Sequence, residues 1–111
     1  MTGKAKKYLS DIQRAIELIE RFVEGIDSFF DYQNDLKTKS AVERQLGIIG
    51  EAVNIYRKEE AEIELSQARQ IIDFRNRIIH SYDSIDDAVV WAILKNHLAI
   101  LKEEVEEGLK R

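Results

Sequence analysis

The chain has no cysteine and no proline, and only five of its 111 residues are glycine. The absence of cysteine excludes disulfides and thiolate metal sites. A protein built from sheets needs turn residues at short intervals, so the scarcity of proline and glycine favours a few long helices. A chain of this length can form one hydrophobic core but not two, and we therefore expect a single domain over residues 1–111.

Long apolar runs and an excess of positive charge are also missing. No run approaches the roughly 18 apolar residues of a membrane-spanning helix, and the first residues turn charged before a signal peptide could form. The formal net charge is −4, so the chain as a whole gains nothing from attraction to nucleic acid or to an anionic membrane. We expect a cytoplasmic protein without a membrane or DNA partner, in which any phosphate would bind at a local basic site.

Apolar residues recur at steps of three and four in four segments, which is typical of helices that bury one face. The predicted helices cover roughly residues 5–26, 38–57 and 66–80, and a last helix starts near Ser84 and carries apolar residues to Val105. The break after the first helix holds a short helical turn with Phe29, Phe30 and Tyr32. The expected fold is all-α, an antiparallel four- to five-helix up-and-down bundle.

Serine residues mark two of the predicted helix starts. Ser66 is the expected N-cap of the third helix. Ser84, with Asp87 three residues later, resembles a capping box at the start of the last helix.

The second predicted helix has an apolar patch outside its core-facing seam. Ile48, Ala52 and Ile55 form this patch, with Gly47 and Gly50 beside them. Glycine costs about 1 kcal/mol inside a helix relative to alanine, so two glycines indicate a tight crossing. Two interpretations stay open: a homodimer through this region, or packing of the glycines within the subunit.

The two histidines do not have the spacing of metal ligands. Metal sites in helical bundles commonly use Glu-x-x-His, whereas Arg77 precedes His80 and Leu94 precedes His97 at that spacing. We therefore expect no metal and no cofactor. His97 lies on the apolar stripe of the last helix, where a lone histidine is typically a core or interface residue with hydrogen-bonded ring nitrogens.

The stretch FRNRIIHSYD, residues 74–83, places a permanent cation among apolar residues. On a helix, the surrounding isoleucine and phenylalanine positions span roughly 160°, and Arg75 falls near their centre. Asn76 and His80 share a neighbouring face, so the amide can reach the imidazole. Arg75 and His80 diverge by about 140° on a regular helix. They can converge if the arginine reaches along the helix surface or if the helix ends near the histidine, and they could also meet partners from a second subunit.

Residue chemistry alone leaves two roles open for Arg75. One is a buried ion pair with Glu51 or Asp73 that clamps the bundle, although desolvation makes such pairs weak stabilisers. The other is a phosphate site, because a guanidinium holds phosphoryl oxygens with its fork of N–H donors. A nearby histidine would then move protons near neutral pH.

Residues 75–82, RNRIIHSY, resemble the R-x4-H-x-Y motif of HepT-like toxins in the HEPN (higher eukaryote and prokaryote nucleotide-binding) superfamily. The segment AVERQLGIIGEAVN, residues 41–54, is similar to the second-helix segment of this family. The segments IIDFRN and DDAVVWAILKNHLAILKEEV are also similar to this family in their order and spacing, so the resemblance covers about residues 40–105. One departure is SQARQ, residues 66–70, where family members often carry a tryptophan; it bears on packing and leaves the motif intact.

The resemblance implies an all-helical homodimer that acts as a metal-independent endoribonuclease, the toxin of a type II toxin–antitoxin system. Two motifs, one from each subunit, would line one interfacial cleft. By position, Arg75 would orient and neutralise the scissile phosphate of RNA, His80 would be the acid and base, and Asn76 would support the site. A MntA-like nucleotidyltransferase antitoxin would inhibit the toxin by transferring AMP from ATP to Tyr82. The alternative is a HEPN subunit that binds a nucleotide or docks the nucleotidyltransferase without cutting RNA.

Overall fold

The computed structural model describes residues 2–59, 62–80 and 85–111, and the side chains of residues 78–80 fall outside this description. The described residues form an all-helical bundle without strands. Its helices are α1 (Gly3–Phe22), α2 (Phe29–Gln33), α3 (Leu36–Tyr56), α4 (Ala68–His80), α5 (Asp87–Asn96) and α6 (Leu98–Leu109). Over the same residues, no helix is both long enough and apolar enough to cross a membrane.

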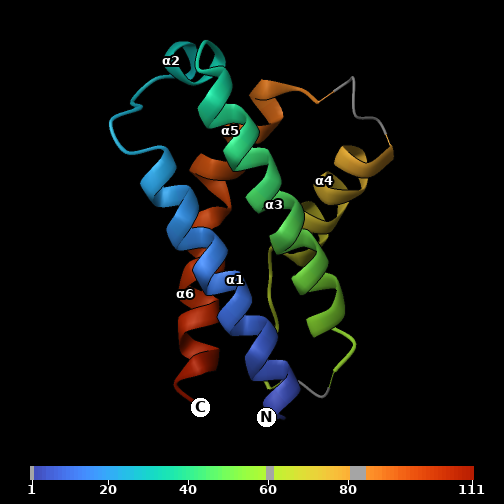
Figure 1. Cartoon of the computed structure of the whole chain (residues 1–111). Coiled ribbons are helices and arrows are strands. Elements are labelled where there is room, and N and C mark those ends of the chain that lie inside the picture. Colours follow the sequence, from blue (N-terminus) through green and yellow to red (C-terminus); the bar gives the residue numbers. More distant parts are fainter. Residues whose placement is uncertain (1, 60–61, 81–84) are drawn as a thin grey trace.

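The long helices alternate in direction, as predicted for an up-and-down bundle. Helix α1 rises from the end of the bundle where both termini lie, α3 descends beside it, α4 rises again, and α5 and α6 descend (Figure 1). Helix α1 packs between α3 and α6, and α4 packs against the far side of α3. The short helix α2 crosses the opposite end of the bundle, next to α5. None of the described helices covers one face of the α1–α3 pair.

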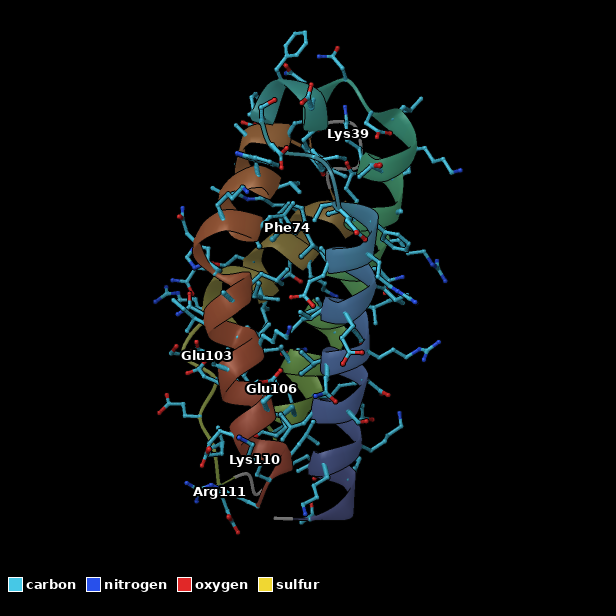
Figure 2. All side chains as sticks on the ribbon, turned by 90° about the vertical axis from the view of Figure 1, so that its left-hand side faces the viewer. Lys39, Phe74, Glu103, Glu106, Lys110 and Arg111 are labelled. Atoms are coloured by element: carbon cyan, nitrogen blue, oxygen red, sulfur yellow. The ribbon has the colours of Figure 1, made fainter. Side chains whose placement is uncertain are left out.

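The core is apolar and is supplied by all six helices. Figure 2 shows Phe74 in the interior, between the helices, and charged side chains such as Glu103 and Arg111 outside. Apart from Tyr32 and Tyr56, no polar or charged side chain is buried among the described residues. The largest side chains that are fully buried are Leu9, Ile12, Ile16, Ile19, Tyr32, Leu46, Ile49, Tyr56, Ile71 and Leu101.

Helix α1 shows why the periodicity was informative and where it failed. Its buried residues recur at the predicted steps of three and four, and the Thr2 hydroxyl caps the helix by accepting a hydrogen bond from the Ala5 N–H, at 3.0 Å. The helix ends at Phe22, so the predicted end at residue 26 was wrong. Gly25 adopts a φ of +83°, a conformation that glycine reaches without steric cost and that ends a right-handed helix.

Helix α2 is the predicted helical turn, and aromatic contacts attach it to α5. The Tyr32 ring lies 5.6 Å from the Trp91 ring, and the Phe29 ring lies 6.4 Å from it in an edge-on arrangement. Tyr32 is fully buried, and this burial raises the pKa of its phenol. These contacts hold the end of the bundle together beside the start of α5.

Helix α3 begins at Leu36, two residues earlier than predicted, because Asp35 caps it. Asp35 Oδ1 accepts a hydrogen bond from the Thr38 N–H at 3.0 Å, and its Oδ2 accepts one from the Thr38 hydroxyl at 2.8 Å. The bond from the backbone N–H is the main reason that the pKa of this carboxyl is lowered. The cap therefore stabilises the fold above the ordinary pKa of aspartate, and this contribution is lost as the pH falls through the lowered value.

We expect Asp35→Ala to lower the melting temperature near neutral pH, because the variant loses the acceptor for the Thr38 N–H. The difference from the unsubstituted protein should shrink as the pH is lowered below about 4. Thermal unfolding followed by circular dichroism over a pH series measures both effects. Asp35→Asn, which keeps an acceptor oxygen, serves as the control. A difference in melting temperature that stays constant with pH would contradict the role of the ionised carboxylate.

Gly50 allows α3 and α4 to cross closely. A Cβ atom at this position would lie 2.3 Å from Arg75 Cβ, 2.8 Å from Arg75 Cγ and 3.2 Å from the Ile71 carbonyl oxygen. A Cβ atom at Gly47 would meet no atom within 4 Å. Of the two interpretations of these glycines, packing within the subunit is therefore confirmed for Gly50, whereas Gly47 opens onto the uncovered face.

The two glycines should respond in opposite ways to the same substitution. In Gly50→Ala, overpacking costs about 1–3 kcal/mol, which exceeds the gain in helix propensity of about 1 kcal/mol, so the free energy of unfolding should fall. Gly47→Ala gains the same helix propensity, and its added Cβ meets no neighbouring atom, so its free energy of unfolding should rise by up to about 1 kcal/mol. Urea unfolding of both variants measures the difference. A Gly50→Ala variant as stable as Gly47→Ala would contradict the tight crossing.

Helices α4 and α5 do not begin at the residues that were predicted to cap them. Helix α4 begins at Ala68, two residues after Ser66, so the prediction of Ser66 as its N-cap was wrong. The Ser66 N–H donates a hydrogen bond to the Glu104 carboxylate of α6 at 3.1 Å. Asp86 caps α5 by accepting a hydrogen bond from the Ala88 N–H at 2.8 Å. The predicted cap residue Ser84 lies outside the described residues.

The last predicted helix is interrupted at His97, which separates α5 from α6. The backbone of His97 has φ −119° and ψ −31°, but its N–H still bonds to the Ile93 carbonyl and its carbonyl accepts from the Leu101 N–H. The interruption is therefore a local bend in a continuous hydrogen-bonded path. His97 is half-buried, and its Nδ1 lies within hydrogen-bonding distance of Gln67 Oε1, as predicted for a packed histidine with a satisfied ring nitrogen.

Candidate functional site

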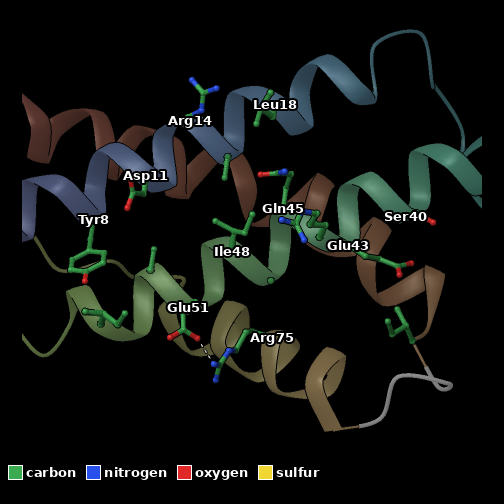
Figure 3. A pocket seen from close by; sticks show the side chains of 16 residues that line it. Tyr8, Asp11, Arg14, Leu18, Ser40, Glu43, Gln45, Ile48, Glu51 and Arg75 are labelled. Atoms are coloured by element: carbon green, nitrogen blue, oxygen red, sulfur yellow. Dashed lines mark hydrogen bonds and ion pairs between the residues drawn. The ribbon is translucent and has the colours of Figure 1, made fainter.

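An open groove of about 940 Å³ runs along the uncovered face of α1 and α3 and reaches α4 at Arg75 (Figure 3). Its floor is formed by apolar or small residues of the two long helices, including Leu18, Ile48 and Ala52. Ile48 keeps 38% of its surface exposed within this hollow. The groove is therefore a concave, partly apolar surface with an arginine at its edge.

Charges of both signs line this groove. The positive groups are Arg14 of α1, Arg44 of α3 and Arg75 of α4, and the negative groups are Asp11, Glu43 and Glu51. The groove is thus formally balanced, although the chain as a whole is acidic. The three arginines come from three different helices, and each has a carboxylate of the same lining nearby in the sequence or in space. The expectation of a local basic site for phosphate stays a prediction.

Arg75 lies where α4 crosses α3, with its aliphatic stem against Gly50. The side chain is 23% exposed, and its guanidinium reaches the groove. Nη2 donates to Glu51 Oε2, and Nη1 donates to Asn76 Oδ1 at 3.2 Å. Arg75 is therefore next to the buried face of α4 but is not enclosed by it. The core-facing residues of α4 are Ile71, Ile72 and Phe74.

The ion pair between Arg75 and Glu51 was one of the two roles considered for the arginine. The Glu51 side chain is 51% exposed, so the pair is not the buried clamp of that hypothesis. Such a pair in contact with solvent contributes little to stability. The guanidinium is thus held in place at the surface of the groove, where an incoming anion could reach it.

The described residues bring together part of the predicted motif. Asn76 is exposed and contacts Arg75 through its amide oxygen. His80 is the last described residue of α4, and its side chain lies outside the description. Its approach to Arg75 stays a prediction. Tyr82 lies outside the described residues altogether. The predicted contact between Asn76 and His80 stays a prediction.

The α1 side of the groove was missed by the sequence reasoning. Tyr8, Asp11, Ala15 and Leu18 line it, and their spacing of three, four and three places them on one face of α1. This second stripe is a signal that the sequence contained. It was hidden because the stronger stripe of core residues dominates the periodicity of the same helix.

The end of the groove near α5 contains a partly buried carboxylate. Glu43 is half-buried, and desolvation, followed by the nearby negative charge of Asp87, raises the pKa of its carboxyl. Asp87 pairs with Lys39 at 2.8 Å and so links the first turns of α3 and α5. Among the described residues, no three histidine, cysteine, aspartate or glutamate side chains form a group that could hold a metal ion.

Comparison with known proteins decides the family. The profile of the family described as "Ribonuclease HepT-like" matches residues 12–108. The chain belongs to the HepT-like ribonuclease family. The resemblance read from the R-x4-H-x-Y motif is thereby confirmed, and membership in this family supports a ribonuclease activity.

Several relatives match the HepT-like chain over nearly its whole length. "Probable ribonuclease HepT" of Thermococcus cleftensis is 40% identical over 111 residues, which is 96% of this chain and 97% of the relative. "Putative RNase TTE0752" of Caldanaerobacter subterraneus is 31% identical, covering 96% of this chain and 95% of the relative. "Putative RNase MJ1380" of Methanocaldococcus jannaschii is also 31% identical, covering 91% and 93%. No solved structure matches the chain.

Proposed function

We propose that this HepT-like protein is the toxin of a toxin–antitoxin system and cleaves RNA without a metal ion. The observation that carries the proposal is Arg75: its guanidinium is held at the edge of a groove by Glu51 and Asn76 and stays partly exposed. A permanent cation fixed in this way suits a phosphodiester. Its place in the R-x4-H-x-Y motif of a ribonuclease family supports RNA as the polymer.

In the proposed reaction, the ribose 2′-hydroxyl attacks the adjacent phosphorus, and the bond to the 5′-oxygen of the next nucleotide breaks. His80 takes the proton from the 2′-hydroxyl or gives one to the leaving oxygen. Arg75 neutralises the charge that develops on the phosphoryl oxygens. The products are a 2′,3′-cyclic phosphate and a 5′-hydroxyl. Because the nucleophile is part of the substrate, no metal-bound water is required.

A homodimer through the groove completes the proposed site. The apolar floor around Ile48 is a surface that a second copy could bury, and the groove carries both arginines and carboxylates. In a twofold interface the same patch meets itself, so an arginine of one subunit can face a carboxylate of the other. Such an interface would bring the two motifs into one cleft and so support the convergence of Arg75 and His80.

Control of the proposed toxin would act at Tyr82. A nucleotidyltransferase partner would join the tyrosine oxygen to the α-phosphorus of ATP and release pyrophosphate. The attached AMP adds bulk and negative charge beside a cleft that must receive RNA phosphate, so it blocks entry and repels the substrate. Both RNA and ATP are available in the cytoplasm, which is the location proposed for the pair.

Incubation of the purified protein with single-stranded RNA in EDTA tests the activity. We expect cleavage with 2′,3′-cyclic phosphate ends, and no cleavage of a matched oligonucleotide with 2′-deoxyribose at every position. Cleavage that requires added metal would contradict the mechanism. After co-expression with a nucleotidyltransferase of the MntA type, intact-mass measurement should show added AMP, and Tyr82→Phe should abolish the addition.

A second candidate is a HEPN subunit that binds a nucleotide or docks the nucleotidyltransferase without cutting RNA. The engagement of Arg75 by Glu51 favours it, because a guanidinium already paired with a carboxylate is less available to a phosphate. AMP on Tyr82 together with no cleavage under any condition would support this candidate over the toxin.

A further inference from the structure

Two consecutive residues of α3 receive the Arg75 side chain, and we call this pair, Gly50 and Glu51, the arginine seat. The stem of Arg75 lies so close to Gly50 that a Cβ atom there would be 2.3 Å from Arg75 Cβ. The carboxylate of Glu51, the next residue, accepts a hydrogen bond from Nη2. The seat thus fixes the arginine at both ends, through steric contact at the stem and through charge at the guanidinium. The pair of Arg75 and Glu51 is marked by the dashed line in Figure 3.

The seat leaves part of the guanidinium available. An arginine has five N–H donors in a fixed planar arrangement. One donor on Nη1 is used by Asn76 and one on Nη2 by Glu51, so three are left uncommitted by contacts among the described residues. A phosphodiester needs only two parallel donors for bidentate binding. The arginine therefore keeps N–H donors for an anion while Glu51 continues to hold it.

The two halves of the seat differ in what they contribute to stability. Gly50 allows the close crossing of α3 and α4 and so serves packing as well as the placement of the Arg75 stem. The Glu51 side chain is 51% exposed, and ion pairs in contact with solvent contribute little to the folded state. What the two residues share is their effect on where the Arg75 guanidinium lies and how it is oriented.

We propose that Glu51 is a positioning residue for RNA cleavage, acting through Arg75 and not through contact with RNA. This inference rests on the ribonuclease function proposed above. A carboxylate that touched the substrate would repel its phosphates, so Glu51 would benefit the reaction through the arginine that it holds. Orientation of a charged group matters most in the transition state, where the phosphoryl oxygens gain charge.

The proposal predicts that kcat and KM respond in different ways. In Glu51→Ala the guanidinium loses its anchor, and kcat should fall by about 10- to 100-fold, because small misplacements of a catalytic group have effects of this size. KM should stay unchanged or decrease, because a negative charge near the RNA has been removed. Glu51→Gln, which keeps an acceptor oxygen for Nη2, should lose less of kcat, and Glu51→Asp should restore part of it.

Steady-state cleavage of a short RNA in EDTA by the full-length variants measures these effects. Asp73→Ala is the matched control, because Asp73 is an exposed carboxylate on α4 that forms no ion pair with Arg75 in the described structure, and its kcat should equal that of the unsubstituted protein. The melting temperatures of the Glu51 variants should change by less than about 5 °C, so that a loss of kcat cannot come from unfolding. If Glu51→Ala were unstable, the isosteric Glu51→Gln variant would decide the result.

Three outcomes would overturn the inference. Unchanged kcat in Glu51→Ala would show that the seat does not position the arginine, and a raised KM with unchanged kcat would place Glu51 in RNA binding. An increase in kcat/KM would make Glu51 an inhibitory partner of Arg75. A His80→Ala variant measured in parallel separates these failures from a failure of the proposed function: if His80→Ala keeps full activity, the ribonuclease mechanism itself is wrong.

Discussion

Replacement of His80 by alanine is expected to lower the kcat of RNA cleavage by about 10²–10⁴-fold, the range typical for the loss of a general acid or base. Arg75→Met, which keeps the stem but removes the charge, should lower kcat by about 10²–10³-fold, as the loss of one electrostatic donor to a developing oxyanion does. Arg75→Lys should recover only part of the loss, because an ammonium lacks the planar fork that binds two phosphoryl oxygens. Cleavage of a fluorescently labelled RNA in EDTA measures all three variants.

Arg77 provides the control for this series. It lies in the same motif, two residues after Arg75, carries the same charge and is exposed on α4. Arg77→Met should keep a kcat close to that of the unsubstituted protein. A fall in kcat that occurs only in Arg75→Met would then show that the position of the arginine matters and not the net charge of the protein. Full activity in His80→Ala, or an equal loss in Arg77→Met, would contradict the roles proposed for the motif.

The second large effect is expected from Ile48→Glu, which should convert the proposed dimer into an inactive monomer. Ile48 keeps 38% of its surface exposed on the floor of the groove, where a second copy would cover it. A carboxylate buried in such an interface without a partner has a large desolvation penalty. The monomer should lose cleavage as well, because each proposed cleft needs a motif from both subunits. Size-exclusion chromatography with light scattering, followed by the RNA assay, measures both results.

Ile100 supplies a matched control for Ile48. It is an isoleucine with a similar exposure of 43%, but it lies on α6 and does not line the groove. Ile100→Glu should therefore leave both the dimer and the activity intact. A dimer that survives in Ile48→Glu would locate the interface elsewhere. A monomeric Ile48→Glu variant that still cleaves RNA would show that one subunit is sufficient.

The fold class was predictable because the core is built from simple helical stripes. Val42, Leu46, Ile49, Val53 and Tyr56 were predicted as one seam of α3, and each is at most 1% exposed. The ends of the helices were less predictable, because they depend on single local events. The left-handed backbone of Gly25, the cap at Asp35 and the bend at His97 each moved a boundary that the apolar periodicity alone could not locate.

The candidate site was predictable in its residue types and only partly in its geometry. The motif and the possible partnership of Arg75 with Glu51 could be read from the sequence. The groove could not, because it depends on how α1 and α3 pack and on which of their faces stays uncovered. The close approach at Gly50 was predicted as a tight crossing, but only the folded chain shows that the residue on the other side is Arg75.

The position of α6 determines when during synthesis this protein can fold. Helix α1 packs against α6, which is synthesised after the other described helices, and their contact extends to Leu9 and Gly108, where an added Cβ would lie 2.7 Å from the leucine. Leu101 and Val105 of α6 are fully buried in the same core. The α6-facing side of α1 therefore stays uncovered on the ribosome until α6 has been translated, although α3 is already available to its other side. A prematurely terminated product that lacks α6 would carry the complete R-x4-H-x-Y motif on a bundle whose core is open on that side.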